Sequence, residues 1–265
     1  MAERALTNEL KALFTINEKK ALNLFLKLGN PNDLLSFQAQ EILRPFFESE
    51  ARYAETLLKA NQKAMMNGRK TTVDLLNIVS DKKYVLFDFD ERIYTNMSNQ
   101  TFTASQQTMT RIKTNIVKNL AKSYQEGLGI RDAGRNLQKE FKKLRTFEAE
   151  RIARTEINSA QNAGAYQTYL DYDVEYHQWW TGQDARVRTS HRALQGMIVR
   201  VGSPFSNGLL RPGDKTGSIK EWIHCRCTTV PYLMPLGYMV PMGQSSFRES
   251  DIIPIPSFKI PRVAF

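Results

Sequence analysis

The spacing of hydrophobic and polar residues predicts helices over the first hundred residues. Apolar residues recur at intervals of three and four from Leu10 to Leu28, and Gly29-Asn30-Pro31 would end this helix. Asn32 or Asp33 would cap the next helix, which we expect to run toward about residue 66 with a kink at Pro45. Residues 1–100 are therefore predicted to form a mostly helical N-terminal domain.

The helical pattern continues over residues 101–171. Thr103-Ala-Ser-Gln106 has the form of a capping box. Gly127 and Gly129 separate the helix that it would begin from a second one over 131–144. A long helix is expected over 147–171, where small residues such as Ala160 and Ala163 favour close packing.

Shorter elements are expected over residues 174–230. Val174, Tyr176, Trp179 and Trp180 favour strands, and glycines divide the rest of the segment into short pieces. With the basic helices over 101–155 and the long helix over 147–171, this small α+β part makes a second domain, residues 101–230. In the first domain, residues 83–90 are the best candidate strand, with Asp88 and Asp90 on its edge.

Residues 231–265 hold six of the ten prolines together with many apolar side chains. Because proline forbids helix and removes backbone donors, we expect an extended arm that lies on a neighbouring surface or packs on its own domain. The predicted fold class is α+β: a helical N-terminal region, a small mixed α+β domain with short strands, and an extended Pro-rich C-terminal arm.

The net charge is +10, and residues 101–155 carry most of it, with 12 Lys and Arg against 5 Asp and Glu. Such a surface favours a polyanionic partner, either nucleic acid or an acidic protein, although a solvated helical face would look the same. Aromatic residues do not alternate with the charges to form a base-stacking platform, so double-stranded DNA, bound without sequence preference, suits them better than single strands. The candidate binding residues are Arg111, Lys113, Lys118, Lys122, Arg135, Lys139, Lys142, Lys143 and Arg145.

All three histidines and both cysteines fall between residues 177 and 227. Cys225 and Cys227 would share one face of a strand. Asp184, Arg188 and His191 would share one face of a short helix, so that His191 could meet the cysteines. Thiolate and imidazole ligands suit a structural zinc ion, and the candidate ligands are His191, His224, Cys225 and Cys227.

The same cluster has a second interpretation without a metal. Two thiols can lie in a core, the commonest place for free cysteine. Asp184, Arg186, Arg188 and His191 would then form a polar network that holds a small domain together. The pattern is compatible with both interpretations, and two cysteines one residue apart do not make a disulfide framework.

Four motifs, taken in order, resemble the Mu F-like head-morphogenesis family of phages. They are the Arg-Thr-Glu helix at residues 154–156, the Trp…Asp-x-Arg-x-Arg-x-x-His segment over 180–191, Pro-Gly-Asp at 212–214 and Cys-Arg-Cys at 225–227. The resemblance covers about residues 120–232. His224 stands where the family has Asn, and Gln195 where it has an acid. The motif residues are Arg154, Thr155, Glu156, Asp184, Arg186, Arg188, His191, Cys225, Arg226 and Cys227.

The resemblance implies a minor capsid component of a tailed phage rather than an enzyme. Such a protein would be made in the host cytoplasm and enter the virion, in the capsid interior or at the portal vertex. Its partners would be the portal protein, a scaffolding or major capsid protein, and double-stranded DNA. It would assist head assembly and DNA packaging or ejection.

Two other functions are compatible with the sequence. A nuclease could use His191 and His224 as general acid and base, with Arg186 or Arg188 stabilising phosphate charge. No P-loop, Ser/His/Asp set or His-Glu-x-x-His motif supports an enzyme. A host DNA-binding module is the other alternative, but the basic helices lack a helix-turn-helix or zinc-finger pattern.

A membrane partner is not expected from the sequence. No segment reaches the ~18 consecutive apolar residues of a membrane span. The first residues also lack the apolar core of a signal peptide.

Overall fold

The computed structural model describes residues 2–29, 37–86 and 91–256, which form two compact units. Unit 1 consists of the described residues of 1–66 and 87–160, and unit 2 of those of 67–86 and 161–265. Helices α3 (Glu50–Val79) and α6 (Ala149–Asp171) contribute residues to both units. The boundary expected after residue 100 falls inside helix α4 (Glu91–Gln125), because the units are built from interleaved segments.

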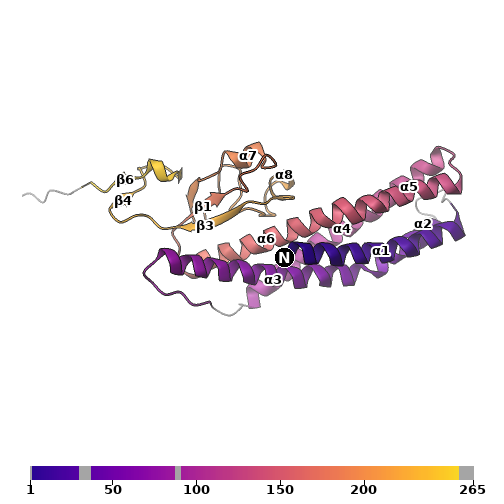
Figure 1. The fold of residues 1–265 in the computed structure, drawn as a ribbon, viewed down its shortest axis with the longest axis horizontal. Coiled ribbons are helices and arrows are strands. Elements are labelled where there is room, and N and C mark those ends of the chain that lie inside the picture. Colours follow the sequence, from indigo (N-terminus) through magenta and orange to yellow (C-terminus); the bar gives the residue numbers. More distant parts are fainter. Residues whose placement is uncertain (1, 30–36, 87–90, 257–265) are drawn as a thin grey trace, which may run out of the picture. The chain divides into compact units, whose positions relative to one another are not determined.

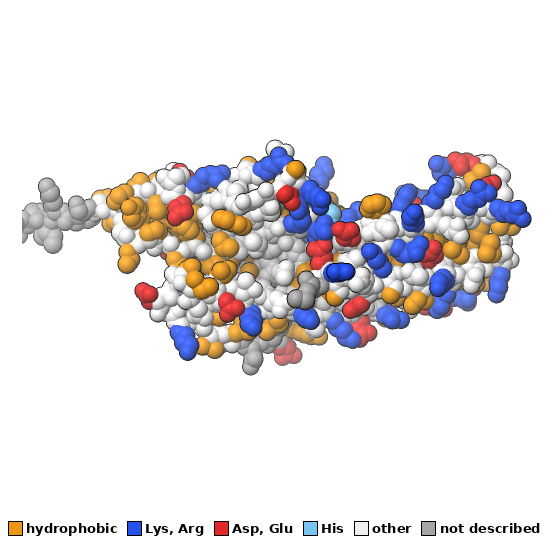
Figure 2. All heavy atoms as spheres, in the orientation of Figure 1, with side chains coloured by type: hydrophobic (Ala, Val, Ile, Leu, Met, Phe, Trp, Pro, Cys, Tyr) orange, Lys and Arg blue, Asp and Glu red, His pale blue; other side chains and the backbone are white. Residues whose placement is uncertain are grey.

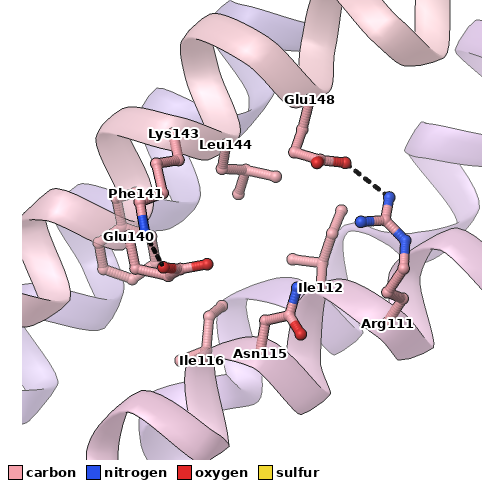
Figure 3. A pocket seen from close by; sticks show the side chains of 9 residues that line it. All are labelled: Arg111, Ile112, Asn115, Ile116, Glu140, Phe141, Lys143, Leu144 and Glu148. Atoms are coloured by element: carbon pink, nitrogen blue, oxygen red, sulfur yellow. Dashed lines mark hydrogen bonds and ion pairs between the residues drawn. The ribbon is translucent and has the colours of Figure 1, made fainter. Parts of the chain in front are cut away.

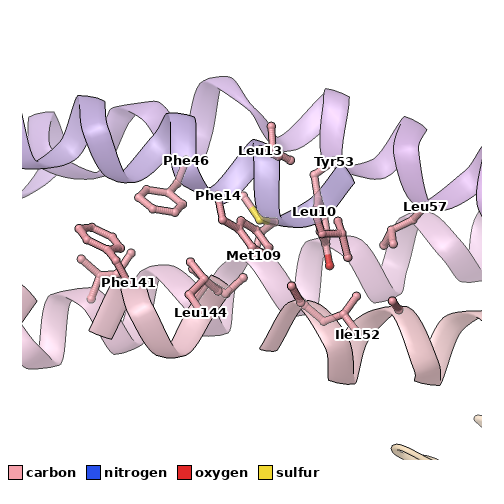
Figure 4. Packing of buried hydrophobic residues seen from close by; sticks show 14 of the residues in the cluster. Leu10, Leu13, Phe14, Phe46, Tyr53, Leu57, Met109, Phe141, Leu144 and Ile152 are labelled. Atoms are coloured by element: carbon pink, nitrogen blue, oxygen red, sulfur yellow. The ribbon is translucent and has the colours of Figure 1, made fainter. Parts of the chain in front are cut away.

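Unit 1 is a bundle of helices around one apolar core (Figure 1). It contains α1 (Ala2–Leu28), α2 (Phe37–Glu48), α4, α5 (Ile130–Lys143) and the first parts of α3 and α6. In Figure 4 the rings of Phe46 and Phe141 face each other, 5.9 Å apart and within 11° of parallel. Burying an aromatic side chain of this size contributes about 1.5–3 kcal/mol, so the helices are held mainly by this core.

The predicted end of the first helix agrees with the structure, whereas the second predicted helix is divided into two. Helix α1 ends at Leu28, and Gly29 follows with φ of +81°. The expected stop at Pro31 and the expected caps Asn32 and Asp33 lie outside the described residues. Helix α2 contains Pro45 and ends three residues later, and α3 then runs past the expected end near residue 66 to Val79.

The capping-box prediction at Thr103 is wrong, because α4 begins twelve residues earlier at Glu91. Ile93 and Met97 pack against the core of unit 1 and hold this earlier part of the helix in place. Helix α4 ends at Gln125 and α5 begins at Ile130, as the glycines between them predicted. A π-helical turn, Leu144–Glu148, joins α5 to α6.

Unit 2 contains a four-stranded antiparallel sheet, which confirms the α+β fold class. Its strands are β1 (Tyr176–Trp180), β2 (Ile198–Arg200), β3 (Thr228–Tyr232) and β5 (Ser246–Phe247), in the order β3-β1-β2-β5. Long loops between the strands carry two short helices, α7 (Thr189–Arg192) and α8 (Ile219–Trp222). Trp179 and Phe205 lie edge to face in the core below the sheet, 4.9 Å apart.

The Pro-rich segment returns to this sheet within the described residues. Its Phe247 is buried in β5 and packs edge-on against Tyr176 at 5.3 Å. Beyond the sheet, β4 (Tyr238–Met239) pairs with β6 (Ile253–Pro254), and a 3-10 turn, Glu249–Asp251, lies between β5 and β6. Up to residue 256 the segment is therefore joined to its own unit rather than being a separate arm, and residues 257–265 lie outside the description.

The candidate strand over residues 83–90 is not supported where it can be assessed. Residues 83–86 have no strand pairing, and 87–90, which include Asp88 and Asp90, lie outside the described residues. The backbone here is held by Tyr172, whose hydroxyl donates to the carbonyl of Val85.

Helices α3 and α6 approach each other closely in unit 2. A Cβ atom added to Gly68 would lie 2.1 Å from the carbonyl oxygen of Gln161. Next to it, the buried guanidinium of Arg69 forms an ion pair with Asp171 at 2.8 Å. The backbones of the two helices therefore meet at this point, and only glycine at position 68 allows it.

Candidate functional site

The side chains of His191, Cys225 and Cys227 converge in the core of unit 2. His191 Nδ1 lies 3.4 Å from Cys227 Sγ and 3.6 Å from Cys225 Sγ. All three residues are at most 2% exposed. Their potential ligand atoms lie within 4.8 Å of one another, so they could hold one metal ion.

Local structure brings these residues together in a way that differs from the sequence prediction. His191 lies on α7, which begins only at Thr189, so Asp184 and Arg188 do not share its helix. The cysteines lie in the extended segment before β3, not on the strand itself. The carbonyl of Cys227 accepts a hydrogen bond from Asn162 Nδ2 at 3.1 Å, which ties this segment to α6.

Glu221 on α8 orients the imidazole of His191. Its Oε2 lies 3.0 Å from His191 Nε2, and Ser190 Oγ donates to the same oxygen at 3.1 Å. Because a carboxylate can only accept, the proton of a neutral imidazole is placed on Nε2. Nδ1 then directs its lone pair toward the two sulfur atoms.

The two thiols share a hydrogen bond, and this separates their pKa values. The bond to Cys227 lowers the pKa of Cys225 despite its burial. The same bond and burial raise the pKa of Cys227.

His224 does not join this group. Its side chain is exposed and its backbone is in the left-handed region, with φ of +56°. Among the described residues the group of potential ligands contains His191 and the two cysteines only. Of the four ligands predicted from the sequence, the structure brings three together.

Arg226 connects two of the sequence motifs across the surface of unit 2. Its guanidinium binds both carboxylate oxygens of Asp184, at 2.5 and 2.6 Å. The hydrogen bonds from Arg226 lower the pKa of Asp184 to about 2. Arg188 donates to the carbonyl of Ile223, whereas the side chain of Arg186 is exposed and only its backbone N–H bonds to Asp184.

Asp214 of the Pro-Gly-Asp motif organises its own loop. The residue is buried, and its carboxylate accepts from the backbone N–H groups of Leu210 and Thr216 at 3.2 and 3.0 Å. The hydroxyl of Thr216 donates to it as well, at 2.8 Å. The motif therefore fixes loop geometry beside the cluster.

The Arg-Thr-Glu motif lies in unit 1 and holds helices together. Arg154 on α6 forms hydrogen bonds with Glu3 of α1 at 2.8 and 3.0 Å. The buried Glu156 accepts from Asn61 of α3 at 3.1 Å, and Asn61 also donates to Thr101 of α4 at 3.0 Å. The hydroxyl of Thr155 donates to the backbone carbonyl of Arg151 in the same helix.

Some of the predicted binding cations are engaged inside unit 1. Figure 3 shows Arg111 reaching Glu148, at 2.7 Å, across a small hollow between α4 and the π-helical turn. Lys113 pairs with Glu50 and lies over the ring of Phe47. Arg145 pairs with Glu18 of α1 at 2.8 Å. These three cations connect helices, so they are poorly placed to contact a partner.

The other predicted cations are exposed on α4 and α5. Lys118 and Lys122 lie near the end of α4, and α5 carries the rest; Figure 2 shows Lys and Arg side chains gathered over this end of the helical unit. Their ion pairs are with residues three or four positions away in the chain: Lys122 with Glu126, Arg135 with Asp132, and Lys143 with Glu140. The exposed set, with Arg131 added, is Lys118, Lys122, Arg131, Arg135, Lys139, Lys142 and Lys143.

Sequence reasoning did not identify Glu221, and it named Asp214 only as part of the Pro-Gly-Asp motif. Glu221 lies in a four-residue helix without periodicity, and its role depends on a partner thirty residues away. Asp214 followed a Pro-Gly pair, which is a turn signal that could have suggested its loop-forming role.

Comparisons with known proteins agree with the motif order. The family model described as "Phage Mu protein F like protein" matches residues 114–230. An uncharacterized protein of Methanocaldococcus jannaschii is 28% identical over 148 residues, which are 53% of this chain and 22% of the relative, so the chain spans about a fifth of that protein. No solved structure matches.

No helix in the described part of the chain is both long enough and apolar enough to cross a membrane. The family match begins within α4 and ends within β3, so it includes the exposed cations, Arg154–Glu156 and the cysteine cluster. It confirms the resemblance drawn from the four motifs, since residues 114–230 are similar to the Phage Mu protein F like family.

Proposed function

We propose that this protein is a minor head component of a tailed phage that associates with the portal vertex and assists head assembly and DNA packaging or ejection. The family match suggests a phage head-morphogenesis protein, which is a structural role. The observation that carries the finer proposal is the exposed cationic surface on α4 and α5, which lies inside the matched region.

The charge balance of this surface favours a polyanion. Residues 118–143 contain seven Lys and Arg against three Asp and Glu. The three acids form ion pairs at the surface with residues three or four positions away, and such pairs contribute little stability. Phosphates or carboxylates of a partner can therefore replace them at little cost.

Two partners fit this surface within a phage head. The packaged double-stranded DNA would be bound through its backbone, without reading sequence. The acidic surface of a portal ring, or a scaffolding or major capsid protein, would be bound by the same charges. The protein would then reside in the virion, in the capsid interior or at the portal vertex.

The proposal is tested by replacing Lys118, Lys122, Lys142 and Lys143 with Gln. The variant should co-purify less with portal rings or assembled heads and bind duplex DNA more weakly. The slope of log affinity against log salt should flatten by up to about 3 to 4, because each lost phosphate contact removes about 0.9.

A matched control removes four exposed lysines elsewhere, Lys59, Lys63, Lys70 and Lys82, by the same change to Gln. It should leave the salt slope and the co-purification unchanged. If both variants behave like the unmodified protein, or if both lose binding equally, the α4–α5 surface is not the interface.

The nuclease alternative receives no support from the site. His191 is 1% exposed, and its ring nitrogens face Glu221 and the two sulfurs. A general acid or base must reach the proton that it transfers, and this imidazole cannot reach a nucleic acid outside the core. Cleavage of DNA or RNA with divalent metals, lost in His191→Ala, would nevertheless overturn the structural role.

A further inference from the structure

We propose that His191, Cys225 and Cys227 bind one zinc ion that ties the loops of unit 2 together. The inference rests on the geometry of these three side chains and is independent of the head-assembly role. Two sulfur atoms and one imidazole nitrogen meet in the core, and all three residues are at most 2% exposed.

The separations of the ligand atoms match a tetrahedral zinc site. With Zn–N of about 2.0–2.1 Å and Zn–S of about 2.3 Å, a tetrahedral angle places nitrogen and sulfur about 3.5 Å apart. His191 Nδ1 lies 3.4 Å from one sulfur and 3.6 Å from the other. An ion between them would thus require little movement of the side chains.

The chemistry of the ligands selects zinc over harder cations. Thiolates and imidazole bind zinc well, whereas magnesium and calcium require oxygen ligands. The nearby carboxylate, Glu221, faces Nε2 of His191 rather than the space between the three ligand atoms. A carboxylate in that position fixes the orientation of a metal-binding imidazole and makes it a stronger ligand.

Three ligands leave the fourth position of the tetrahedron to a water molecule or a hydroxide. Among the described residues, no other His, Cys, Asp or Glu belongs to the group. Trp179 lies edge-on to His191 at 5.2 Å, and all three ligand residues are at most 2% exposed, so the site is buried in the core. The ion would act as a cross-link between α7 and the segment before β3.

Metal analysis of the full-length protein, purified without chelators, tests the assignment. About one zinc per chain is expected. Exchange with Co²⁺ should produce the sulfur-to-metal charge-transfer absorption of thiolate ligands and the intense visible bands of a tetrahedral site. His191→Ala, Cys225→Ser and Cys227→Ser should each lose both signals.

His224→Ala is the matched control, because this neighbouring histidine is exposed and outside the group. It should keep one metal per chain and an unchanged Co²⁺ spectrum. Loss of metal in His224→Ala would overturn the three-ligand assignment.

Because a ligand variant can lose its metal by unfolding, the unmodified protein supplies an independent measurement. Its two thiols should resist a thiol reagent under native conditions and react after a chelator removes the zinc. Purified protein without zinc that also gives no Co²⁺ spectrum on titration would refute the site. That result would leave portal and DNA binding untouched, since the cations of α4 and α5 take no part in the cluster.

Discussion

His177 is a buried histidine without a hydrogen-bond partner among the described residues. Both ring nitrogens are enclosed in the core of unit 2, where the rings of Tyr166, Tyr169 and Phe205 lie 5.0 to 5.6 Å away. Desolvation by burial lowers its pKa to about 4, because the charged imidazolium would have no compensating partner. The folded protein therefore binds this proton less readily than the unfolded chain does.

His177 should therefore make the folded protein less stable in acid. Between about pH 6.5 and pH 4 the unfolded chain carries more protons at this position than the folded protein, so the free energy of unfolding falls as pH falls. The loss reaches at most about 3 kcal/mol, since one pKa unit is about 1.4 kcal/mol. Urea unfolding at several pH values should show it.

His177→Phe should remove this part of the pH dependence while keeping an aromatic ring in an aromatic environment. At pH 7 the variant should be as stable as the unmodified protein or more so, because it buries no unpaired nitrogen. An identical pH profile for both proteins would mean that His177 is protonated, or paired, in the folded state.

At the level of single residues, the sequence indicated the chemistry of the cluster but not its supporting contacts. Residue type and proximity in the chain were enough to associate His191 with the cysteines. They could not exclude His224, because only the fold shows that its side chain is exposed. Nor could they find Glu221, because a carboxylate acquires this role only through a fold that brings α8 against α7.

Among the elements, the start of α4 shows why a local signal can mislead. Thr103 and Gln106 satisfy the capping-box pattern, but these residue types are also tolerated inside a helix. The buried face of α4 continues backward through Ser105 and Thr101, two polar residues that interrupt the apolar pattern in the sequence. The hydroxyl of Ser105 donates to the carbonyl of Phe102, and the hydroxyl of Thr101 accepts from Asn61 of α3. The contact between Thr101 and Asn61 exists only once the helices pack together.

The close approach of α3 and α6 predicts opposite effects for two glycine substitutions. Gly68→Ala should destabilise the protein by about 1–3 kcal/mol, because the new methyl group would overlap the carbonyl oxygen of Gln161 and the helices must separate. Thermal unfolding followed by circular dichroism would measure the change.

Gly134→Ala provides the matched control within another helix. Its Cβ would meet Phe25 at 3.5 Å, an ordinary contact. Alanine is the better helix former, so the variant should gain about 0.5–1 kcal/mol. Equal destabilisation by both substitutions would show that helix packing near Gly68 is looser than the structure indicates.

In the whole molecule, the four sequence motifs lie in two units that are stabilised in different ways. Arg154 and Glu156 join the helices of unit 1, which has a large apolar core. The Asp184–Arg226 pair and the cysteine cluster lie in unit 2, whose core around Trp179 is smaller and whose loops are long. A small core of this kind gains most from an internal cross-link.

Removal of the proposed zinc should therefore weaken unit 2 and spare unit 1. Since metal binding to the folded site contributes directly to folding, a chelator should reduce hydrogen-exchange protection in the strands and loops of residues 177–230. Protection of α1, α2 and α5 should not change, because their core contains none of the ligands. Hydrogen exchange of the full-length protein with and without chelator measures both units in one sample. A uniform loss over both units would show that they unfold as one, and no loss at all would show that unit 2 is held by its apolar core alone.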